Sequence, residues 1–228
     1  SKAVKERGQA AVALAGGDTP RGLYILLSRE PYVSAVSWKR ILFFWGDERA
    51  VPPDNAQSNY RMAVDALLSR VPVQPENVFR IRAEAENLEA AASEYEELLR
   101  RTLPHSANGV PVFDIVLLGM GADGHTASLF PGSPALQERE RFAVAVYVPQ
   151  INQRRITLTY PVLNSARRLV FLVSGESKAD ALAKATAGPY NPENIPAQGI
   201  QTSSGDVLWL ADADAGKLLL DRLPEKPA

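Results

Sequence analysis

Short apolar runs that alternate with longer helical patterns constrain the fold of this chain more than any other feature. Runs of strand length, rich in β-branched and aromatic residues, predict strands at 9–15, 41–45, 114–118, 143–148, 156–159, 169–173 and 207–210, with a weaker candidate at 78–81. Helical patterns lie between them at 21–28, 59–69, 87–103, 177–186 and 214–220. Strands separated by helices indicate βαβ units, so we expect an α/β fold with an open, mostly parallel, Rossmann-like sheet and helices on both faces. The short connection from 148 to 156 also allows an antiparallel pair and hence a mixed sheet.

The composition fits one globular domain. The chain has 228 residues, of which 46% are hydrophobic and 22% charged, and this is enough for a sizeable core. The segments 104–111 and 189–201 are rich in Pro, Asn and Gly, but the composition does not change across either of them. We therefore expect a single domain over residues 1–228. The opening sequence SKAVKERGQ is typical of the end of a helix, so we expect a short N-terminal piece to precede Ser1.

Charge and cysteine content argue against several classes of function. The net charge of −1 favours neither nucleic acid nor an anionic membrane as a partner. No apolar run approaches the roughly 20 residues of a membrane-spanning helix. The absence of cysteine excludes disulfides, thiolate metal sites and a cysteine nucleophile, and it favours a cytoplasmic location. The sequence leaves the oligomeric state open between a monomer and a small homo-oligomer.

The most informative local motif is the glycine-rich turn GMGADGH at 119–125, which follows the apolar run 114–118. It presents His125, one of 2 histidines in the chain, with Asp123 just before it. Open α/β sheets bind their ligands at the carboxyl ends of the strands, and titratable side chains concentrate in such sites. The turn therefore predicts a functional site. The alternative is a structural histidine that only satisfies a local hydrogen bond.

The same turn also matches the Gly-x-Gly-x-x-Gly pattern of dinucleotide-binding folds. That pattern requires a helix directly after the glycines and an acidic residue at the end of the next strand. Here Pro131 and Gly132 interrupt the chain soon after the turn, and the run 143–148 ends in Pro149 and Gln150. The context of the motif therefore argues against nicotinamide or flavin binding.

A second glycine-rich loop, AGGDTP at 15–20, follows the first predicted strand. Gly16 and Gly17 let backbone N–H groups approach an anion closely, and the start of the next helix adds partial positive charge. Thr19 offers a hydroxyl donor. The loop therefore predicts a phosphate site, with a simple turn capped by Asp18 or Thr19 as the alternative.

A third group of polar residues follows the run 41–45. Asp47, Glu48 and Arg49 place two carboxylates and an arginine at the end of a strand, and arginine is the natural planar partner of a phosphate or carboxylate. The alternative is a surface ion-pair cluster that contributes little, with Ser58 as the cap of the next helix. Further basic residues lie beside later strands, namely Arg154, Arg155 and Lys178.

Four segments match the motifs of a known enzyme family, in order along nearly the whole chain. They are GGDTP at 16–20, WGDERAVPPDNAQSNY at 45–60, DIVLLGMGADGHTASLFPG at 114–132 and RRITLTYPVLNSARRLVFLVSGESKADAL at 154–182. Together they resemble the 6-phosphogluconolactonases, hydrolases of the oxidative pentose phosphate pathway. The resemblance implies an α/β fold related to glucosamine-6-phosphate deaminase, a phosphosugar lactone as substrate, and catalysis without metal or cofactor. One position departs from the pattern, because the family's first loop usually has serine where this chain has Asp18, whose charge would repel a phosphate.

The resemblance also implies roles for the residues singled out above. A lactone is an activated ester, so its hydrolysis needs a general base for water and donors for the developing oxyanion. His125 is the predicted base, and Asp123 is the side chain predicted to orient it. The predicted substrate and phosphate ligands are Gly16, Gly17, Thr19, Asp47, Arg49, Arg155 and Lys178.

Two other functions stay open. Glucosamine-6-phosphate deaminase shares the Asp-Gly-His turn, but its pattern continues into Asn-Glu-Pro, whose carboxylate assists ring opening, where this chain has Leu-Phe-Pro at 129–131. It also has Asp-Glu-Tyr where this chain has Asp-Glu-Arg at 47–49. A non-catalytic sugar-phosphate sensor, the ligand-binding half of a regulator, would be joined to a basic helix-turn-helix segment, which is not visible here. Such a sensor would also not need His125.

Overall fold

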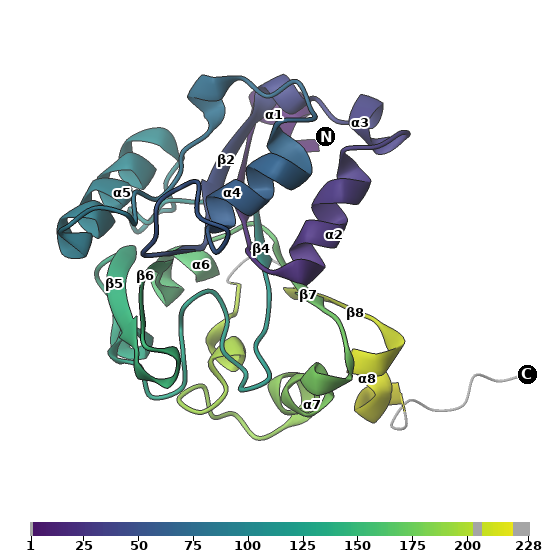
Figure 1. The fold of residues 1–228 in the computed structure, drawn as a ribbon, viewed down its shortest axis with the longest axis vertical. Helices are drawn as coiled ribbons and strands as arrows, with labels where there is room; N and C mark the ends of the chain where they lie inside the picture. The colour runs from purple at the N-terminus through teal and green to yellow at the C-terminus, as the bar shows by residue number, and fades with distance from the viewer. Residues whose placement is uncertain (1, 203–206, 221–228) are drawn as a thin grey trace, which may run out of the picture.

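Two β-sheets, one parallel and one antiparallel, organise the computed structural model, which describes residues 2–202 and 207–220 (Figure 1). The parallel sheet has the order β2-β1-β4-β7-β8 and consists of β1 (Ala10–Leu14), β2 (Ile41–Trp45), β4 (Ile115–Leu118), β7 (Leu169–Val173) and β8 (Val207–Ala211). The antiparallel sheet has the order β3-β6-β5 and consists of β3 (Asp47–Arg49), β5 (Ala143–Val148) and β6 (Gln153–Leu158). The α/β fold with a mostly parallel sheet is confirmed.

The antiparallel pair that the sequence allowed does form, but it lies outside the main sheet. β5 pairs with β6, and β3 adds to the other edge of β6 with Arg49 opposite Arg155. The sequence did not predict β3, because its polar residues show no apolar alternation. The weak candidate strand at 78–81 is reduced to a single bridge between Phe43 and Val78. The structure therefore has two sheets where the sequence allowed one mixed sheet.

The helices match the predicted ones except at their ends. α2 begins earlier than predicted, α4 continues into a wider π turn at Val64–Leu68, and the short helices α3 and α6 were not predicted. None of the described helices is long and apolar enough to cross a membrane. The helices are α1 (Lys2–Arg7), α2 (Asp18–Leu27), α3 (Tyr32–Ala35), α4 (Asn59–Ala63), α5 (Leu88–Thr102), α6 (Tyr160–Asn164), α7 (Ala179–Ala187) and α8 (Ala213–Leu220), with 3₁₀ turns at Trp38–Arg40, Pro75–Asn77, Pro134–Gln137, Pro149–Ile151, Glu176–Lys178 and Pro196–Gly199.

Both faces of the parallel sheet are covered at its centre. All five residues of β7 are buried, as expected for a strand that is packed on both sides. In Figure 1, α7 and α8 lie beside the β7 and β8 end of the sheet, and α5 lies beside β5. Aromatic rings fill part of the core: Phe44 stacks on Phe79 with centroids 4.8 Å apart and meets Phe113 edge-on at 5.3 Å.

The order of the parallel strands creates a topological switch point beside β1. β1 pairs with β2 on one side and with β4 on the other. The loops that follow such neighbouring strands diverge and leave a crevice at the carboxyl ends of the strands. The segment after β1 is the glycine loop at 15–17, and the segment after β4 is the turn at 119–125. The fold therefore brings the first two sequence motifs to one crevice.

Two buried tyrosine hydroxyls fix the ends of β1 and β2 at this crevice. Tyr24 of α2 accepts a hydrogen bond from the N–H of Ala15 at 3.0 Å and donates one to its C=O at 2.9 Å. Tyr95 of α5 makes the same pair of bonds with Trp45, at 2.9 and 3.0 Å. Burial raises the pKa of both tyrosine hydroxyls, so they remain protonated donors. Each hydroxyl satisfies backbone groups at the point where the chain leaves its strand.

Replacing Tyr24 by phenylalanine should destabilise the protein. Tyr24→Phe leaves the buried N–H and C=O of Ala15 without this partner, so the free energy of unfolding should fall by about 2–4 kcal/mol. Urea unfolding followed by circular dichroism measures the change. Tyr32→Phe is the matched control, because Tyr32 is 43% exposed and its loss should change stability by less than about 0.5 kcal/mol. Equal effects of the two substitutions would contradict the role of the Tyr24 hydroxyl.

Candidate active site

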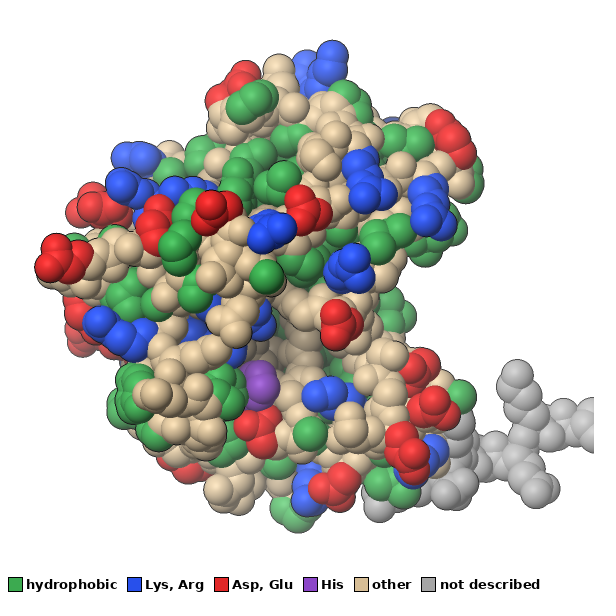
Figure 2. Space-filling view, in the orientation of Figure 1, with side chains coloured by type: hydrophobic (Ala, Val, Ile, Leu, Met, Phe, Trp, Pro, Cys, Tyr) green, Lys and Arg blue, Asp and Glu red, His purple; other side chains and the backbone are tan. Residues whose placement is uncertain are grey.

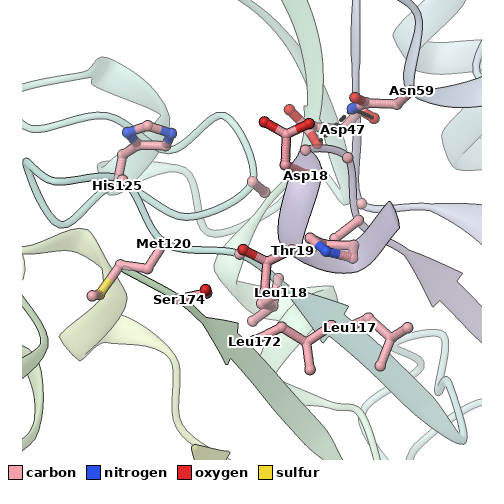
Figure 3. A pocket seen from close by; sticks show the side chains of 18 of the residues that line it. Asp18, Thr19, Asp47, Asn59, Leu117, Leu118, Met120, His125, Leu172 and Ser174 are labelled. Carbon is pink, nitrogen blue, oxygen red and sulfur yellow. Dashed lines mark hydrogen bonds between the residues drawn. The ribbon is translucent and has the colours of Figure 1, made fainter. Parts of the chain in front are cut away.

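A pocket of about 430 Å³ occupies the crevice beside β1. Figure 2 shows a hollow in one face of the molecule that histidine, basic and acidic side chains border. Leu117, Leu118 and Leu172, from the ends of β4 and β7, form an apolar part of its wall (Figure 3). All predicted site residues except Asp123, which bonds to His125, line the pocket: Gly16, Gly17, Thr19, Asp47, Arg49, His125, Arg155 and Lys178.

The glycine loop keeps free backbone N–H groups at the pocket. Gly17 occupies the N-cap position of α2 with a φ of 98°, in the left-handed region that favours glycine, and no side chain caps the helix. The alternative in which Asp18 or Thr19 caps α2 is therefore wrong. Within the part of the chain that the structure describes, the N–H groups of Asp18 and Thr19 have no acceptor. The start of α2 thus retains the donors and the partial positive charge that suit an anion.

A close approach by Asn59 explains why residue 16 is glycine. A Cβ at Gly16 would lie 1.7 Å from Asn59 Oδ1, so a larger residue would displace the asparagine. Asn59 is 1% exposed and lines the pocket. Its Nδ2 donates to the backbone oxygen of Asp47 at 2.9 Å and to Oδ1 of Asp47 at 3.1 Å. The sequence identified residue 59 only as a helix start, so its place in the site was missed.

Asp18 also lines the pocket, and no side chain of the described residues neutralises its charge. The residue is exposed, and its carboxylate forms no hydrogen bond or ion pair with any residue that the structure describes. Figure 3 shows this carboxylate at the start of α2, on the side of the pocket across from His125. The loop therefore combines N–H donors that attract a phosphate with one carboxylate that opposes it.

His125 and Asp123 form a hydrogen-bonded pair on the turn after β4. Nδ1 of His125 lies 2.6 Å from Oδ1 of Asp123, and the backbone N–H of His125 donates to the same oxygen at 3.1 Å. An ionised carboxylate only accepts, so Nδ1 carries the hydrogen, and in the neutral imidazole the lone pair therefore lies on Nε2. Gly121 makes room for the pair, because a Cβ there would lie 2.1 Å from Nδ1. Phe130 stacks on the imidazole with centroids 4.0 Å apart.

The environment of Asp123 keeps its carboxyl group ionised. Partial burial raises the pKa of this carboxyl, but the hydrogen bonds and charge of His125 lower it by more, so the pKa lies below its ordinary value. The contribution of the pair to stability is therefore present at neutral pH and is lost as the pH falls through this lowered pKa. The His125 side chain is 27% exposed, so the pair is accessible to a ligand. It holds the imidazole in the tautomer that a general base requires.

Glu48 stabilises a helix instead of facing the pocket. Its carboxylate accepts hydrogen bonds from the N–H groups of Arg49, Asn59 and Tyr60, each at 2.8 Å, and from the hydroxyl of Ser58 at 3.0 Å. Burial raises the pKa of Glu48, and the backbone N–H bonds oppose that rise. Ser58 also accepts a bond at the start of α4, so its predicted capping role is confirmed. Of the two acidic residues of the Asp-Glu-Arg motif, Asp47 therefore lines the pocket and Glu48 caps α4.

Three cationic side chains from different elements line the pocket: Arg49 of β3, Arg155 of β6 and Lys178 after β7. Nη1 of Arg49 donates to the C=O of Gln57 at 2.7 Å. Nη1 of Arg155 lies 3.7 Å from a carboxylate oxygen of Asp47. Among the described residues, Arg49 and Lys178 form no ion pair. The structure thus places these three predicted ligands at one pocket, and two of them have no ion-pair partner within the described part of the chain.

Ser174 is a further pocket residue that the sequence did not identify. Its hydroxyl donates to Asp212 at 2.5 Å, which fixes the start of the segment that carries Lys178. Over residues 2–202 and 207–220, no group of three His, Cys, Asp or Glu side chains is arranged to hold a metal ion.

Comparisons with known proteins agree with this geometry. The model of the family described as glucosamine-6-phosphate isomerases/6-phosphogluconolactonase matches residues 1–209. A 6-phosphogluconolactonase from Synechocystis is 42% identical over 96% of this chain and 88% of its own length. A solved 6-phosphogluconolactonase from Trypanosoma brucei is 32% identical, covers 94% of this chain and 88% of its own, and has a TM-score of 0.82. A solved monomeric glucosamine-6-phosphate deaminase is 28% identical, covers 95% and 91%, and has a TM-score of 0.79.

The fold and the pocket define an α/β protein in which a glycine loop at a helix start and an oriented histidine line the same pocket. The chain belongs to the family of glucosamine-6-phosphate isomerases and 6-phosphogluconolactonases.

Adding a methyl group at Gly121 should separate the histidine–aspartate pair. The Cβ of Gly121→Ala would lie 2.1 Å from His125 Nδ1 and 2.4 Å from Asp123 Oδ1. Because the bonds from His125 hold down the pKa of Asp123, that pKa should rise in the variant. Carbon-13 NMR of the side-chain carboxyls, recorded against pH, measures the shift.

Gly22→Ala is the matched control for this substitution. A Cβ at Gly22 meets nothing within 4 Å, and the residue lies inside α2. The control should leave the titration of Asp123 unchanged and should stabilise the helix by up to about 1 kcal/mol. An Asp123 titration that is also unchanged in Gly121→Ala would contradict the close packing of the turn.

Proposed function

We propose that this protein hydrolyses 6-phospho-D-glucono-1,5-lactone to 6-phosphogluconate, a step of the oxidative pentose phosphate pathway. One observation carries the proposal: an imidazole oriented by a carboxylate lies across one pocket from a helix start with free N–H groups (Figure 3). Hydrolysis of a phosphorylated lactone needs a base for water and a site for the remote phosphate. The names of the relatives from Synechocystis and Trypanosoma brucei support the same substrate.

The proposed reaction uses His125 as a general base. Nε2 of His125 takes a proton from a water molecule, and the hydroxide attacks the carbonyl carbon of the lactone. N–H and cationic donors on the pocket wall stabilise the negative charge that develops on the carbonyl oxygen. The ring C–O bond then breaks, and the proton on Nε2 passes to the departing ring oxygen. Asp123 stabilises the imidazolium while it exists, and the product acid releases one proton to the solvent.

The phosphate group of the substrate is proposed to bind at the start of α2. Gly16, Gly17 and Thr19 supply backbone and hydroxyl donors there, and Lys178 and Arg49 line the same pocket. Holding the phosphate restricts where the lactone carbonyl can lie. Binding energy from a group that does not react is thereby used to orient the carbonyl toward the base.

The two alternative functions have less support. Phe130 occupies the place where the resemblance puts the assisting carboxylate of a deaminase, and its ring stacks on His125. A sensor that only binds a sugar phosphate does not require an oriented imidazole with a free Nε2.

A proton-release assay with freshly prepared 6-phosphogluconolactone tests the proposed function. The protein should release protons well above the rate of spontaneous hydrolysis and should release no ammonia from glucosamine 6-phosphate. Ammonia release would favour the deaminase, and binding of 6-phosphogluconate without turnover of the lactone would favour the sensor.

We further propose that the protein acts in the cytoplasm as a single α/β domain, either monomeric or as a small homo-oligomer, without a bound cofactor or metal and without a nucleic-acid or membrane partner. The cysteine-free composition and the net charge of −1 support this setting. One of the relatives is a chloroplastic enzyme of Arabidopsis, so compartment varies among these proteins.

Replacing His125 by glutamine should mainly lower kcat. Glutamine has similar reach but cannot accept a proton from water, so kcat should fall roughly 10²–10⁴-fold while KM and stability change little. The proton-release assay, corrected for spontaneous hydrolysis, measures the loss. The wild-type kcat should also fall at acid pH as the imidazole becomes protonated, and this acid limb should be absent in His125→Gln. A near-normal kcat in the variant would show that another group is the base.

Substitutions at the proposed phosphate site should raise KM where they remove an attractive group and lower KM where they remove a repulsive charge. Lys178→Ala removes an attractive charge and Thr19→Ala a donor, so both should raise KM by about 3–30-fold with little change in kcat. Asp18→Asn removes a repulsive charge, so it should lower KM by a few-fold, and the effect should shrink at high salt. Initial rates at low and high ionic strength measure these changes. A raised KM in Asp18→Asn would show that Asp18 binds the substrate directly.

A further inference from the structure

Asp47 is the buried centre of a hydrogen-bond network at the pocket. It is 6% exposed, and both of its carboxylate oxygens contact protein groups. Oδ1 accepts from Asn59 Nδ2 at 3.1 Å, and Oδ2 accepts from the hydroxyl of Ser128 at 2.6 Å. Oδ2 also lies 3.7 Å from Nη1 of Arg155, which itself lies 3.4 Å from the Ser128 hydroxyl. One carboxylate thus joins three side chains from three different segments.

Each of these segments forms a different wall of the pocket. Asn59 lies against Gly16, so it contacts the glycine loop. Ser128 lies on the turn that carries His125. Arg155 comes from β6 of the antiparallel sheet. The carboxylate of Asp47 therefore ties the proposed phosphate loop and the histidine turn to the second sheet.

The histidine turn is bent so that Ser128 reaches Asp47. Ala127 has a φ of 48°, which is the left-handed conformation that a residue with a Cβ rarely adopts. The bend lies between His125, which lines the pocket, and Ser128, which is fully buried at 0% exposure. The Ser128–Asp47 bond helps to hold this bend, because a strained conformation persists only where surrounding contacts determine it.

Asp47 also balances the charge of a buried arginine. The side chains of Arg155 and Asp47 are 10% and 8% exposed, and Nε of Arg155 has no partner among the described residues. Removing one member of a buried charge pair leaves the other uncompensated and free to reorient. Arg155 would then lose its charge partner on the pocket wall and keep its bonds to Gln153 at 3.0 Å and to Ser128 at 3.4 Å.

From this network we propose that Asp47 is a positioning residue that sets the distance between the phosphate loop and His125 without touching the substrate itself. The inference rests on the proposed lactone hydrolysis. It replaces the sequence-based expectation that Asp47 is a direct substrate ligand. If Asp47 acts in this way, loss of its carboxylate misplaces the base and the arginine. The glycine loop keeps its contact with Asn59, because Nδ2 of Asn59 also donates to the backbone oxygen of residue 47 at 2.9 Å.

Asp47→Asn tests the proposal, because it keeps the shape of the side chain and removes its charge. The misplaced base should lower kcat by about 10–100-fold. KM and the inhibition constant of inorganic phosphate should change by less than about 3-fold, because the groups proposed to bind the phosphate are unchanged. The acid limb of kcat should remain, because His125 is still the base.

Ser128→Ala removes one bond of the network and should lower kcat by about 3–10-fold. The double variant should have a kcat no lower than that of Asp47→Asn alone, because both substitutions break the same network.

Asp114→Asn is the matched control. Asp114 precedes β4 at the opposite end from the pocket, is 11% exposed at its side chain, and pairs with Arg7 and with Arg167 at 3.5 Å. This control should lower the Tm and leave kcat and KM unchanged. If Asp47→Asn does not fold, Ser128→Ala tests the proposal instead, because its kcat should fall while its KM stays nearly unchanged.

Three results would overturn the positioning role. An Asp47→Asn variant that loses Tm as the control does but keeps kcat would show a purely stabilising residue. A raised KM with kcat retained would show a direct ligand, and loss of the acid limb would show that Asp47 is the base. Wild-type hydrolysis in the same assay tests the proposed function separately, so the two proposals fail in distinguishable ways.

Discussion

The pocket depends on the arrangement of strands around β1. Because β1 has β2 on one side and β4 on the other, the chain segments that leave β1 and β4 must separate, and a crevice exists before any functional side chain is placed. The glycine loop, the histidine turn and the Lys178 segment each follow a parallel strand into that crevice. The antiparallel sheet then closes one side of it with Arg49 and Arg155.

The glycines, which have no side chain, determine the shape of the site as much as the functional side chains do. The space that a Cβ of Gly16 would need is filled by Asn59, and the space that a Cβ of Gly121 would need is filled by the His125–Asp123 pair. These glycines are therefore required by close packing, while Gly17 is required by its backbone conformation. The two adjacent glycines of the loop at 15–17 are therefore required for different physical reasons, Gly16 by packing and Gly17 by its φ.

The sequence predicted most of the fold and the outline of the site, for identifiable reasons. Apolar runs such as 41–45, 143–148 and 169–173 were located without error, because burial in a sheet leaves a strong local pattern. The polar strand β3 leaves no such pattern. The role of Glu48 and the network around Asp47 were also missed, since they depend on partners that are far away in the chain: Ser128 lies 81 positions from Asp47. Contacts of this kind become visible only when the segments have been placed in space.

The way in which Glu48 caps α4 makes the start of this helix unavailable to an anionic ligand. Both α2, which begins at Asp18, and α4, which begins at Asn59, start at this pocket. The first turn of α4 is already occupied by an internal carboxylate, whereas among the described pocket residues the N–H groups that start α2 are free. The protein therefore neutralises the start of α4 with its own side chain, whereas the start of α2 keeps the donors that the proposed phosphate site requires. The single phosphate of the proposed substrate fits the start of α2, whereas a phosphate at the start of α4 would meet a helix end that is no longer positive.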